Sequence, residues 1–431
     1  MIDIFTYASG EEPPKLKAIL SRSIETAPEL EATVDTIIAE VRAEGDPAVA
    51  RWTRQLDGVD LTEAGARVDP GDIERAHRGM DSGFLNILEQ AAANIRRFHE
   101  AQKQSDWYLE DGDGVVLGKR IVPVQTAALL VPGASAPLFS TLLMAAIPAV
   151  IAGVDRICVA TPARTDGTVH PAVLAAAHIV GVKEVYRIFG AQAVAALAYG
   201  TQTIPRADVL AGPGHPSVQI AKKRVYGDVG IDMIAGPSEI VVLADETASA
   251  REIAADLLSQ AEHGSGYEAA VCITPSQTLA NEVAVEVERQ TADLSHADAI
   301  RRALAAFGAV VVVPDLDCGI DLVNRLAPEH LEIVVEDPWP RVEQVRNAGA
   351  IFVGPASSEP VGDYYAGTNH ILPTAGAARF ASSVGVATFL KNISIVAYTS
   401  ARLEKTAGHI IAMAEAEGLD AHANAIRLRN L

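Results

Sequence analysis

Gln260 and His263 stand three positions apart near the end of a segment whose residue pattern predicts a helix. Residues at this spacing share one face of a helix, so an amide oxygen and an imidazole nitrogen can reach the same metal ion. A plainer alternative is that both are polar residues that close the helix. These two residues alone leave both interpretations open.

Three further segments combine titratable side chains with turn-forming residues. In the first, Glu329 and His330 follow Pro328, and such a pair can supply two bases; alternatively, Glu329 caps a helix and His330 is half-buried. The second segment, residues 358–370, is dense in glycines and carboxylates, which favours a shaped loop over a plain polar connector. The third, residues 417–422, ends in a histidine near the C-terminus, and a lone histidine there often faces solvent.

Together the four segments offer glutamine, histidine and aspartate side chains. Their oxygen and nitrogen donors suit zinc or a similar divalent ion better than a metal that prefers thiolates. The three cysteines, Cys158, Cys272 and Cys318, lie in or beside predicted strands, outside these segments. Their spacing matches no zinc knuckle or disulfide framework, so we interpret them as small core residues.

The helix that carries the Gln-x-x-His pair has recognisable ends. Ser249 is followed three residues later by a glutamate, which is a capping-box pattern, and Gly264 is the glycine expected just after a helix end. The pattern predicts a helix from about residue 250 to residue 263. One side of it is apolar, and the other carries Asp256, Gln260 and His263. One face can therefore pack while the other binds.

Short β-rich runs alternate with Ala/Leu-rich helical stretches in two blocks, which predicts parallel sheets covered by helices. The predicted strands are 127–131, 156–161 and 184–188 in the first block, and 239–244, 269–274, 309–313 and 350–353 in the second. The predicted fold is α/β, with two Rossmann-like parallel-sheet domains and small N- and C-terminal helical appendages.

The predicted domain division has four parts. They are an N-terminal helical appendage over 1–27, a discontinuous first Rossmann-like domain over 28–127 and 239–382, a second over 128–238, and a C-terminal segment over 383–431. The first domain carries most of the candidate metal and catalytic residues. The C-terminal segment has too little apolar surface for its own core, so we expect it to pack on another domain or another subunit.

The composition excludes several classes of function. With 431 residues, of which 49% are apolar, the chain can form two or more domains with substantial cores. Its formal charge of −20, without a basic run, argues against nucleic-acid binding. The N-terminus lacks a signal-peptide pattern, and no apolar stretch approaches about 18 residues without a polar break. We therefore expect a soluble, cytoplasmic protein without a nucleic-acid or membrane partner.

At these residues the sequence resembles the histidinol dehydrogenase family, and the resemblance extends from about Val41 to Arg427. Several long motifs occur in the family's order, which is more specific than any single pattern. They are VRAEGD (41–46), GAQAVAALAYGT (190–201), AGPSE (235–239), DLLSQAEHG (256–264), APEHLE (327–332), GDY (362–364), NHILPT (369–374) and AH (421–422).

The resemblance implies oxidation of L-histidinol, through histidinaldehyde, to L-histidine in two NAD-dependent steps, the last reaction of histidine biosynthesis. It also implies one zinc ion per subunit, with the ligands Gln260, His263, Asp363 and His422. Glu329 and His330 would be the catalytic pair. The substrate site would comprise the four zinc ligands and His330 together with Ser238, Glu359, His370 and Glu417.

The chemistry of these residues suits such a division of roles. Zinc has no redox role and would orient the substrate by holding its nitrogen atoms. His330 could remove the hydroxyl proton, and Glu329 could activate water to hydrate the aldehyde, which predicts activity that leans alkaline. In the family the tail ligand comes from the neighbouring subunit. The resemblance therefore implies a homodimer in which residues 383–431 form a dimerisation segment and His422 completes the neighbour's site.

Departures from the family pattern lie mainly on the cofactor side. The positions expected to contact NAD are Leu130, Gln192 and His215. The family usually has tyrosine in place of Leu130 and asparagine in place of His215. It usually has glycine where this chain has Ala134 and Phe189. These changes bear on the strength of NAD binding and on the choice of dinucleotide.

Three alternative functions stay open. One is a paralogous NAD-dependent dehydrogenase that acts on another small polar alcohol, for example a sulfonated diol. Another is a zinc hydrolase in which Glu329 activates a metal-bound water. The last is a non-catalytic zinc-binding relative that senses histidinol or histidine.

Overall fold

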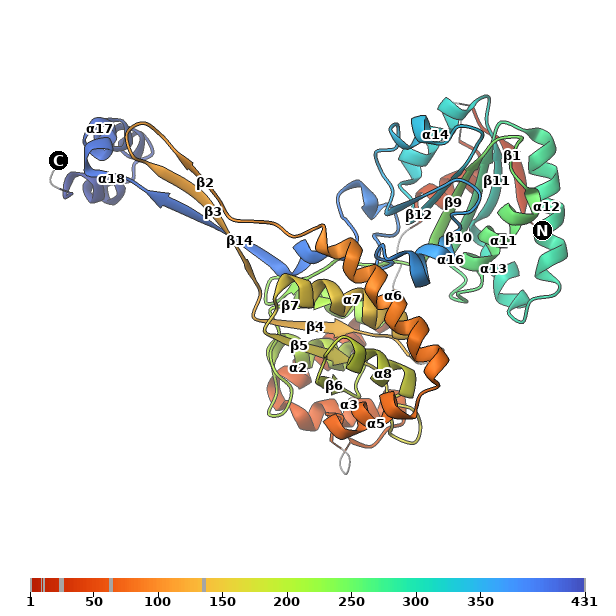
Figure 1. Cartoon of the computed structure of the whole chain (residues 1–431), viewed down its shortest axis with the longest axis horizontal. Helices are drawn as coiled ribbons and strands as arrows, with labels where there is room; N and C mark the ends of the chain where they lie inside the picture. The colour runs from red at the N-terminus through yellow and green to blue at the C-terminus, as the bar shows by residue number, and fades with distance from the viewer. Residues whose placement is uncertain are drawn as a thin grey trace. The chain divides into compact units, whose positions relative to one another are not determined.

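The computed structural model describes residues 2–8, 10, 12–22, 27–61, 65–133 and 137–429. The chain forms two compact units. The larger unit comprises Met1–Gln102 and Gln125–Phe389, and the smaller unit comprises Lys103–Val124 and Leu390–Leu431. The larger unit contains two parallel β-sheets, here called sheets A and B, with helices packed against them (Figure 1). The predicted α/β fold with two parallel sheets is therefore confirmed.

Sheet A has six strands in the order β1-β11-β10-β9-β12-β13, and every neighbouring pair is parallel. Its strands are β1 (Asp3–Thr6), β9 (Glu239–Ala244), β10 (Ala269–Thr274), β11 (Gly308–Val312), β12 (His330–Val334) and β13 (Ala350–Val353). From β9 onward, the strand order is that of a doubly wound fold, with the first strand of the block in the middle.

Helices cover both faces of sheet A. They are α1 (Pro14–Leu20), α11 (Ala250–Ala261), α12 (Gln277–Thr291), α13 (Ala297–Phe307), α14 (Leu316–Leu326) and α15 (Trp339–Val342). Along β9, Ile240 and Val242 pack in one apolar cluster, while Val241 and Leu243 pack in another on the opposite face. Because both faces are buried, the strand reads as a continuous apolar run rather than an alternating one.

Sheet B repeats the same topology with five parallel strands in the order β6-β5-β4-β7-β8. Its strands are β4 (Thr126–Leu130), β5 (Arg156–Ala160), β6 (Glu184–Tyr186), β7 (Val209–Ala211) and β8 (Gly230–Ile231). Its helices are α2 (Pro28–Glu44), α3 (Asp46–Asp57), α5 (Pro70–Gly79), α6 (Ser82–Glu100), α7 (Phe139–Ala152), α8 (Pro171–Ile179), α9 (Ala191–Tyr199) and α10 (Pro216–Val225).

The structure distributes the first 127 residues differently from the predicted division. The segment 28–57 was grouped with 239–382, but its buried residues Val34, Ile37 and Val41 join the core of sheet B, because their apolar side chains pack against α9 and α10. Likewise the segment 1–27 was predicted to be helical, yet it begins with β1, which extends the open edge of sheet A beside β11. Contacts of this kind join segments far apart in the sequence, so the neighbouring residues carry no pattern that predicts them.

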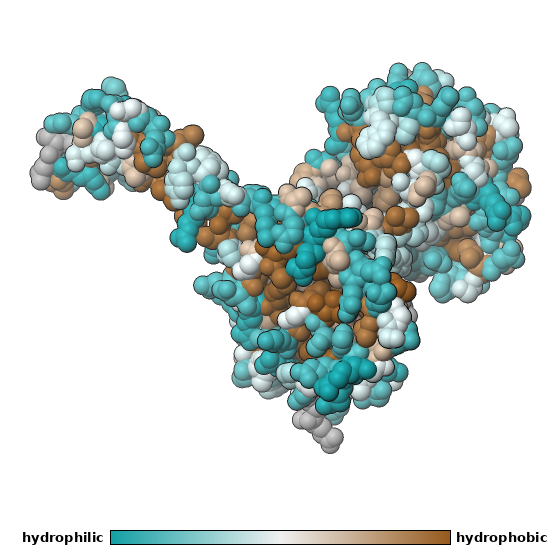
Figure 2. Space-filling model, in the orientation of Figure 1, coloured by the Kyte–Doolittle hydropathy of each residue, from teal (hydrophilic) through white to brown (hydrophobic). Residues whose placement is uncertain are grey.

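The smaller unit contains an antiparallel sheet, sheet C, in the order β14-β3-β2. Its elements are β2 (Trp107–Glu110), β3 (Val116–Pro123), β14 (Leu390–Ala397), α17 (Ser400–Ala416) and α18 (Asp420–Arg427). Trp107, Tyr108 and Leu109 on the edge strand are exposed, as are Ile393 and Val396 on β14. Hydrophobic patches are visible along this unit in Figure 2. This unit therefore exposes several large apolar side chains.

Two further observations concern the predicted classes of residue. Among the described residues, none of the helices has the length and apolar character needed to cross a membrane. Cys158 and Cys272 are buried within β5 and β10, as predicted, and Cys318 packs partly buried against the core of sheet A.

The short elements described in the rest of the larger unit are α16 (Glu359–Val361), the π-helical turn η1 (Gly362–Ala366), η2 (Ala377–Arg379) and η3 (Val386–Phe389).

Candidate active site

The predicted metal, catalytic and substrate residues of the larger unit gather at the amino ends of two neighbouring strands of sheet A. Ser238 precedes β9, and Glu329 and His330 stand at the start of β12, which pairs with β9. Helix α11 returns from the carboxyl end of β9, so its last turn carries Gln260 toward this edge. Ligands of doubly wound sheets usually bind at the carboxyl edge. This site lies at the opposite, amino edge.

His330 is the first residue of β12, and its side chain is buried. Its Nδ1 lies 3.0 Å from the carbonyl oxygen of Glu239. Because a carbonyl oxygen only accepts hydrogen bonds, Nδ1 carries the proton and Nε2 of the neutral ring keeps a lone pair. No described residue hydrogen-bonds to Nε2. Burial lowers the pKa of His330 to about 3, which favours the neutral ring and leaves Nε2 able to accept a proton.

Glu329 lies beside His330 and is held by the same residue of β9. Its Oε2 accepts a 3.0 Å hydrogen bond from the N–H of Glu239 and lies 3.7 Å from Nδ1 of His330. Burial raises the pKa of Glu329 well above its ordinary value, and the charge of Glu239 raises it further. The backbone of Glu239 thus fixes both members of the predicted catalytic pair.

The side chain of Glu239 is anchored in turn. It forms a buried ion pair with Arg22, which follows α1, and its Oε1 accepts a 2.8 Å hydrogen bond from the N–H of Ala375. Burial raises the pKa of Glu239, and the charge of Arg22 opposes that rise. Neither residue was predicted to belong to the site. Glu239 closes the AGPSE motif, which was a usable signal, whereas nothing near Arg22 in the sequence marks it.

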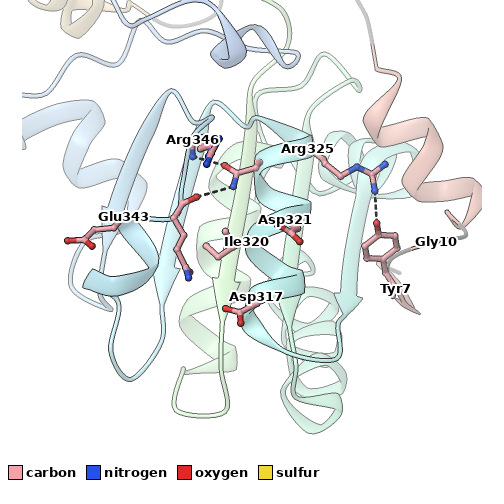
Figure 3. A pocket seen from close by; sticks show the side chains of 10 residues that line it. Tyr7, Gly10, Asp317, Ile320, Asp321, Arg325, Glu343 and Arg346 are labelled. Atoms are coloured by element: carbon pink, nitrogen blue, oxygen red, sulfur yellow. Dashed lines mark hydrogen bonds between the residues drawn. The ribbon is translucent and has the colours of Figure 1, made fainter.

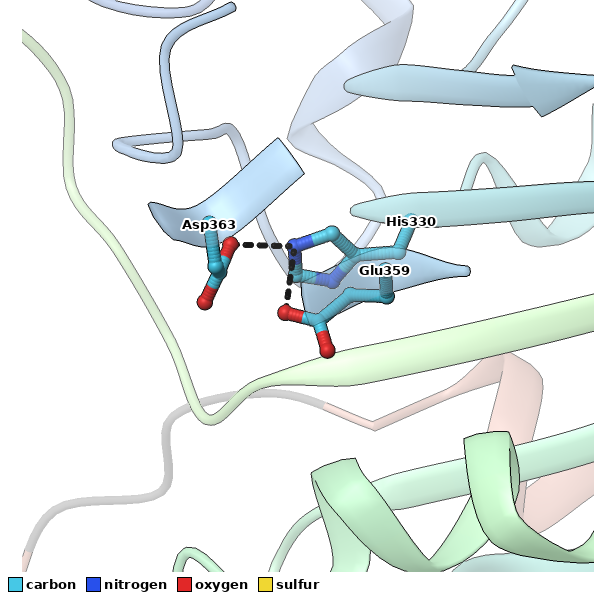
Figure 4. A group of neighbouring side chains, drawn as sticks. All are labelled: His330, Glu359 and Asp363. Carbon is cyan, nitrogen blue, oxygen red and sulfur yellow. Dashed lines mark ion pairs between the residues drawn. The ribbon is translucent and has the colours of Figure 1, made fainter. Parts of the chain in front are cut away.

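Nε2 of His330 faces two carboxylates (Figure 4). It lies 4.0 Å from Oε1 of Glu359, the first residue of α16, and 3.9 Å from Oδ1 of Asp363 in η1. One potential ligand atom from each of these three residues lies within 4.8 Å of the other two. Nitrogen and carboxylate oxygen donors this close together fit a small divalent cation.

Crowding and burial raise the pKa values of these carboxylates. Burial, followed by the charge of Asp363, raises the pKa of Glu359 to about 8. Burial raises the pKa of Asp363 to about 6. A nearby cation would stabilise the ionised forms and lower both pKa values again. The electrostatics of this cluster therefore suit a site that binds a cation.

The buried amide of Gln260 also suits a site that binds a cation. It is 1% exposed, and neither atom of its amide forms a hydrogen bond of good geometry with the described residues. The amide does lie close enough to Glu359 to lower that carboxyl's pKa. Buried amides are rarely left without partners, because the lost hydrogen bonds with water are costly. A ligand atom would satisfy this amide, as expected for a metal ligand.

His263 lies just beyond the helix that carries Gln260. It is exposed, and its Nδ1 lies 3.0 Å from Oγ of Ser238, so two predicted substrate-site residues are in contact. Helix α11 ends at Ala261, two residues before the predicted end, and His263 occupies the following turn. Its start was predicted correctly, since the side chain of Ser249 caps the helix.

A second pair of carboxyls lies behind Glu359. Oε1 of Glu332, in β12, accepts a 2.8 Å hydrogen bond from the N–H of Glu359. Glu332 also forms a side-chain hydrogen bond with Asp256 of α11. Burial raises the pKa of Glu332 to about 9 and that of Asp256 to about 6. Neither was predicted to be a site residue, although Glu332 closes the APEHLE motif and Asp256 shares the polar helix side with Gln260.

His370 reaches the site from the loop after η1. Its Nδ1 lies 3.0 Å from the backbone oxygen of Asp363, and its Nε2 lies 3.2 Å from Oγ1 of Thr141 in α7. Burial lowers the pKa of His370 to about 4, which favours the neutral ring. His370 therefore contacts the backbone of a predicted zinc ligand.

Two predicted site residues, Glu417 and His422, belong to the smaller unit. Glu417 follows α17, His422 lies in α18, and both are exposed. All the other predicted site residues lie in the larger unit.

The predicted cofactor residues lie at the carboxyl edge of sheet B, between β4 and β7, where the strand order reverses. A cavity of about 560 Å³ opens there, and its lining includes Asp57, Phe189, Gln192 and His215. Helices α9 and α10 begin at its wall. Leu130 ends β4 with its side chain in the core of sheet B rather than on the cavity. The substitution at Ala134 lies outside the described residues.

Gln192 is buried in this cavity wall and points one amide group at a carboxyl. Its Nε2 donates a 3.1 Å hydrogen bond to Oδ2 of Asp57, while its Oε1 has no partner among the described residues. Burial raises the pKa of Asp57 to about 6, and this hydrogen bond opposes the rise. The free amide oxygen can accept a hydrogen bond from a bound ligand.

A groove of about 850 Å³ lies elsewhere on the larger unit, along α14 (Figure 3). Its wall includes Tyr7, Asp317 and Arg325. Arg325 donates to the Tyr7 hydroxyl, and Asp317 pairs with Arg341, so these two charged groups have partners within the protein. None of the predicted site residues lines this groove, and its size alone does not make it a site.

Comparison with known proteins gives consistent matches along the chain. Residues 20–430 match the family model described as histidinol dehydrogenase. The histidinol dehydrogenase of Thermosynechococcus vestitus is 49% identical over 401 residues, which cover 93% of each chain. That of Moorella thermoacetica is 51% identical over 398 residues, covering 92% of this chain and 94% of the relative. The crystal structure of histidinol dehydrogenase from Elizabethkingia anophelis matches with a TM-score of 0.92 at 35% identity, covering 99% of this chain and 98% of the other.

Proposed function

The chain belongs to the histidinol dehydrogenase family, and we propose that it oxidises L-histidinol, through histidinaldehyde, to L-histidine with two NAD and one zinc ion per subunit. The observation that carries the proposal is the cluster at the amino edge of sheet A, where the unprotonated Nε2 of His330 faces the buried carboxyl of Glu359 and the partly buried carboxyl of Asp363. The overall reaction would consume L-histidinol, one water and two NAD⁺ and yield L-histidine, two NADH and three protons, one proton from the first oxidation and two from the second. Water supplies the second oxygen of the product carboxylate.

The proposed zinc ligands are Gln260, His263, Asp363 and His422 of the partner subunit. The unpaired buried amide of Gln260 and the raised pKa of Asp363 support this assignment, because a cation would satisfy the first and lower the second. Glu359 and His330 border the same space, and we assign them to the substrate and to proton transfer. When bound, zinc would supply a Lewis-acidic anchor for the amine and imidazole nitrogens of the substrate.

His330 is the proposed base for the first oxidation. Its Nδ1–H is committed to the Glu239 carbonyl, so Nε2 is the atom that can accept the hydroxyl proton as the hydride leaves. Burial disfavours the resulting imidazolium, as the lowered pKa indicates. The carboxylates of Glu359 and Asp363 lie about 4 Å from Nε2 and, once ionised, would stabilise that positive charge.

Glu329 is the proposed base for the second oxidation, in which a water molecule adds to the aldehyde. Its raised pKa favours the protonated form, so more of the carboxyl becomes available as a base as the pH rises. A carboxyl tuned in this way supports the expectation that activity increases toward alkaline pH. The substrate itself would be bordered by Ser238, Glu359, His370 and the partner subunit's Glu417.

The proposed NAD site is the cavity at the carboxyl edge of sheet B. Two features support it: the position at the reversal of strand order, and the amino termini of α9 and α10 at the cavity wall, where backbone N–H groups favour phosphate oxygens. The free Oε1 of Gln192 offers an acceptor to the cofactor. His215 stands at the start of α10 and could donate the hydrogen bond that an asparagine usually supplies.

A homodimer is part of the proposal. His422 and Glu417 lie in the smaller unit, apart from the other site residues, and the same unit exposes Trp107, Tyr108 and Leu109. A second copy of the chain that covered this surface would bury the exposed aromatics and could receive the two tail residues at its site. Catalysis would then depend on dimer formation.

One alternative has its own supporting observation. Phe189 and His215, two departures from the family pattern, both line the proposed cofactor cavity. A changed cofactor cavity beside an intact set of metal and acid-base residues would also suit a paralogous dehydrogenase of another small polar alcohol. The acid-base cluster by itself would suit a hydrolase as well.

Counting NADH per substrate molecule tests the proposal. Zinc-loaded dimer would be incubated with limiting L-histidinol and excess NAD, and NADH followed by absorbance. We expect two NADH per histidinol, with histidine as the product. No NADH, with zinc bound and the dimer intact, would favour the paralogue, and a screen of other polar alcohols would follow. A zinc hydrolase would form no NADH from histidinol and would instead cleave an ester or amide substrate supplied without NAD.

A further inference from the structure

Thr141 hydrogen-bonds to a histidine of the site from outside the predicted site residues. It lies in the first turn of α7, is 3% exposed, and places Oγ1 3.2 Å from Nε2 of His370. The other nitrogen of that ring, Nδ1, lies 3.0 Å from the backbone oxygen of Asp363. A chain of two hydrogen bonds therefore connects α7 to the peptide of a proposed zinc ligand.

The direction of both hydrogen bonds follows from the chemistry of the partners. The Asp363 carbonyl only accepts, so Nδ1 of His370 carries a proton. In the neutral tautomer with its proton on Nδ1, Nε2 is an acceptor, and the Thr141 hydroxyl at 3.2 Å donates to it. Both ring nitrogens are thus committed, and the imidazole has one tautomer and one orientation. Metal-site histidines and carboxylates are commonly oriented by such outer partners.

The residue before His370 shows that α7 supports this loop at a second point. The side-chain amide of Asn369 donates to the Met144 carbonyl at 2.7 Å and lies 3.3 Å from Nε2 of the buried His99. Thr141 and Met144 are one turn apart on α7. Helix α7 is therefore the platform for the loop, and Thr141 makes the contact that leads to Asp363.

A close contact with α6 restricts the same loop. Gly367 has a positive φ of 107°, and a Cβ atom there would come within 2.5 Å of the Asn94 carbonyl oxygen. Asn94 also donates a 2.9 Å hydrogen bond to the backbone oxygen of Tyr365. The backbone from Asp363 to His370 is thus held at both ends, so a change at His370 acts on a loop with little freedom to compensate.

We propose that Thr141 is a positioning residue of this enzyme, which fixes the tautomer of His370 and through it the orientation of Asp363 toward the metal. The inference deepens the proposed function and rests on it for the identity of the metal and the substrate. In this proposal Thr141 does not bind the metal ion. It requires only the hydroxyl, so serine should replace threonine and valine should not.

Thr141→Val and Thr141→Ser are the informative variants, with Thr291→Val as a matched control. Valine keeps the shape of threonine and removes the donor, while serine keeps the donor and removes the methyl group. Thr291 is a buried threonine whose hydroxyl donates to Val287 within α12, away from the site. Circular dichroism and a thermal unfolding curve establish that each variant is folded.

Three readouts distinguish positioning from a general effect on folding. Zinc affinity, measured by competition with a chelator, should fall about 10–100-fold in Thr141→Val and stay within about 3-fold of the parent in Thr141→Ser and Thr291→Val. The kcat/KM for histidinol should likewise fall in Thr141→Val and stay near the parent value in Thr141→Ser and Thr291→Val. Long-range proton–nitrogen NMR of the full chain labelled in its histidines should show His370 with the proton on Nδ1, and a mixture of tautomers in Thr141→Val.

Wild-type zinc affinity and an unchanged His370 tautomer in Thr141→Val would overturn the proposal. So would a folded Thr141→Ser that loses as much as Thr141→Val, since that would assign the effect to packing. If Thr141→Val does not fold, Thr141→Ala removes the same donor with less steric demand, and the same criteria apply. A parent protein that binds zinc and shows the Nδ1 tautomer but forms no NADH would overturn the proposed function while the inference about Thr141 stands.

Discussion

Replacing Arg22 by methionine would remove the charge that supports the catalytic pair. Arg22 is 8% exposed, pairs with the carboxylate of Glu239, and donates a 3.3 Å hydrogen bond to the carbonyl of Tyr267. Methionine has a similar length and no charge, so the change removes the counter-charge and keeps most of the volume. Glu239 would then be a buried carboxyl whose remaining side-chain hydrogen bond comes from the N–H of Ala375.

The expected loss of stability follows from the burial of the pair. The side chains of Arg22 and Glu239 are 2% and 11% exposed, so solvent screens their interaction little. Removing one partner of a buried ion pair typically costs about 3–5 kcal/mol, because the other charge stays buried without compensation. Glu239 can take up a proton, since burial already raises its pKa, and this limits the cost. We therefore expect a loss of about 3 kcal/mol near pH 7.

Urea unfolding of Arg22→Met, Glu239→Gln and the double variant measures this effect. The double variant should recover much of the loss, because a neutral glutamine needs no counter-charge. Arg289→Met is the control: its ion pair with Glu286 lies at the surface of α12, so the change should have little effect on stability. A loss below about 1 kcal/mol in Arg22→Met, or no recovery in the double variant, would refute this account of the pair.

Three other predictions address the site directly. His330→Asn should lose turnover and keep zinc, measured by NADH formation and metal analysis; loss of zinc would instead make His330 a ligand. His422→Asn should lose zinc, and full zinc occupancy would remove His422 from the ligand set. In the metal-free protein, stability to urea should fall as the pH rises from about 5 to about 9. In the folded state Glu359 and Glu332 have pKa values of about 8 and about 9, so they keep their protons over most of this range. In the unfolded chain the same carboxyls lose their protons near the ordinary value of 4.5, so a rising pH favours unfolding. Stability that rises with pH over this range in the apoprotein would contradict those assignments.

The sequence predicted the elements whose signals are local. Ser249 caps α11, the apolar side of that helix is buried, and β9, β10 and β13 have the predicted bounds. Strand β12 was missed because it begins directly after Pro328-Glu329 and carries the buried polar residues His330 and Glu332. Buried polar residues interrupt the apolar run from which a buried strand is predicted. In β12 these residues are His330 of the candidate site and Glu332 behind it.

Residues that act across the fold were not predictable from the sequence alone. Arg22 meets Glu239 across 217 positions, and Thr141 meets His370 across 229. Neither has a neighbour in the sequence that reveals its partner, since the contact depends on how the chain packs. Asp256 and Glu332 were partly predictable. Each lies near a predicted site residue in the sequence, but the hydrogen bond between them depends on how α11 packs against β12.

The order in which sheet C is synthesised has a consequence for protein production. Strands β2 and β3 are made early, whereas β14, which pairs with β3 along its whole length, is made only after the larger unit. At roughly 5–20 residues per second, translation leaves that edge of β3 without its neighbour for tens of seconds. An aromatic hairpin with an open edge can pair with another nascent chain. Co-expressed chaperones that shield this edge until β14 is made should therefore increase the soluble yield.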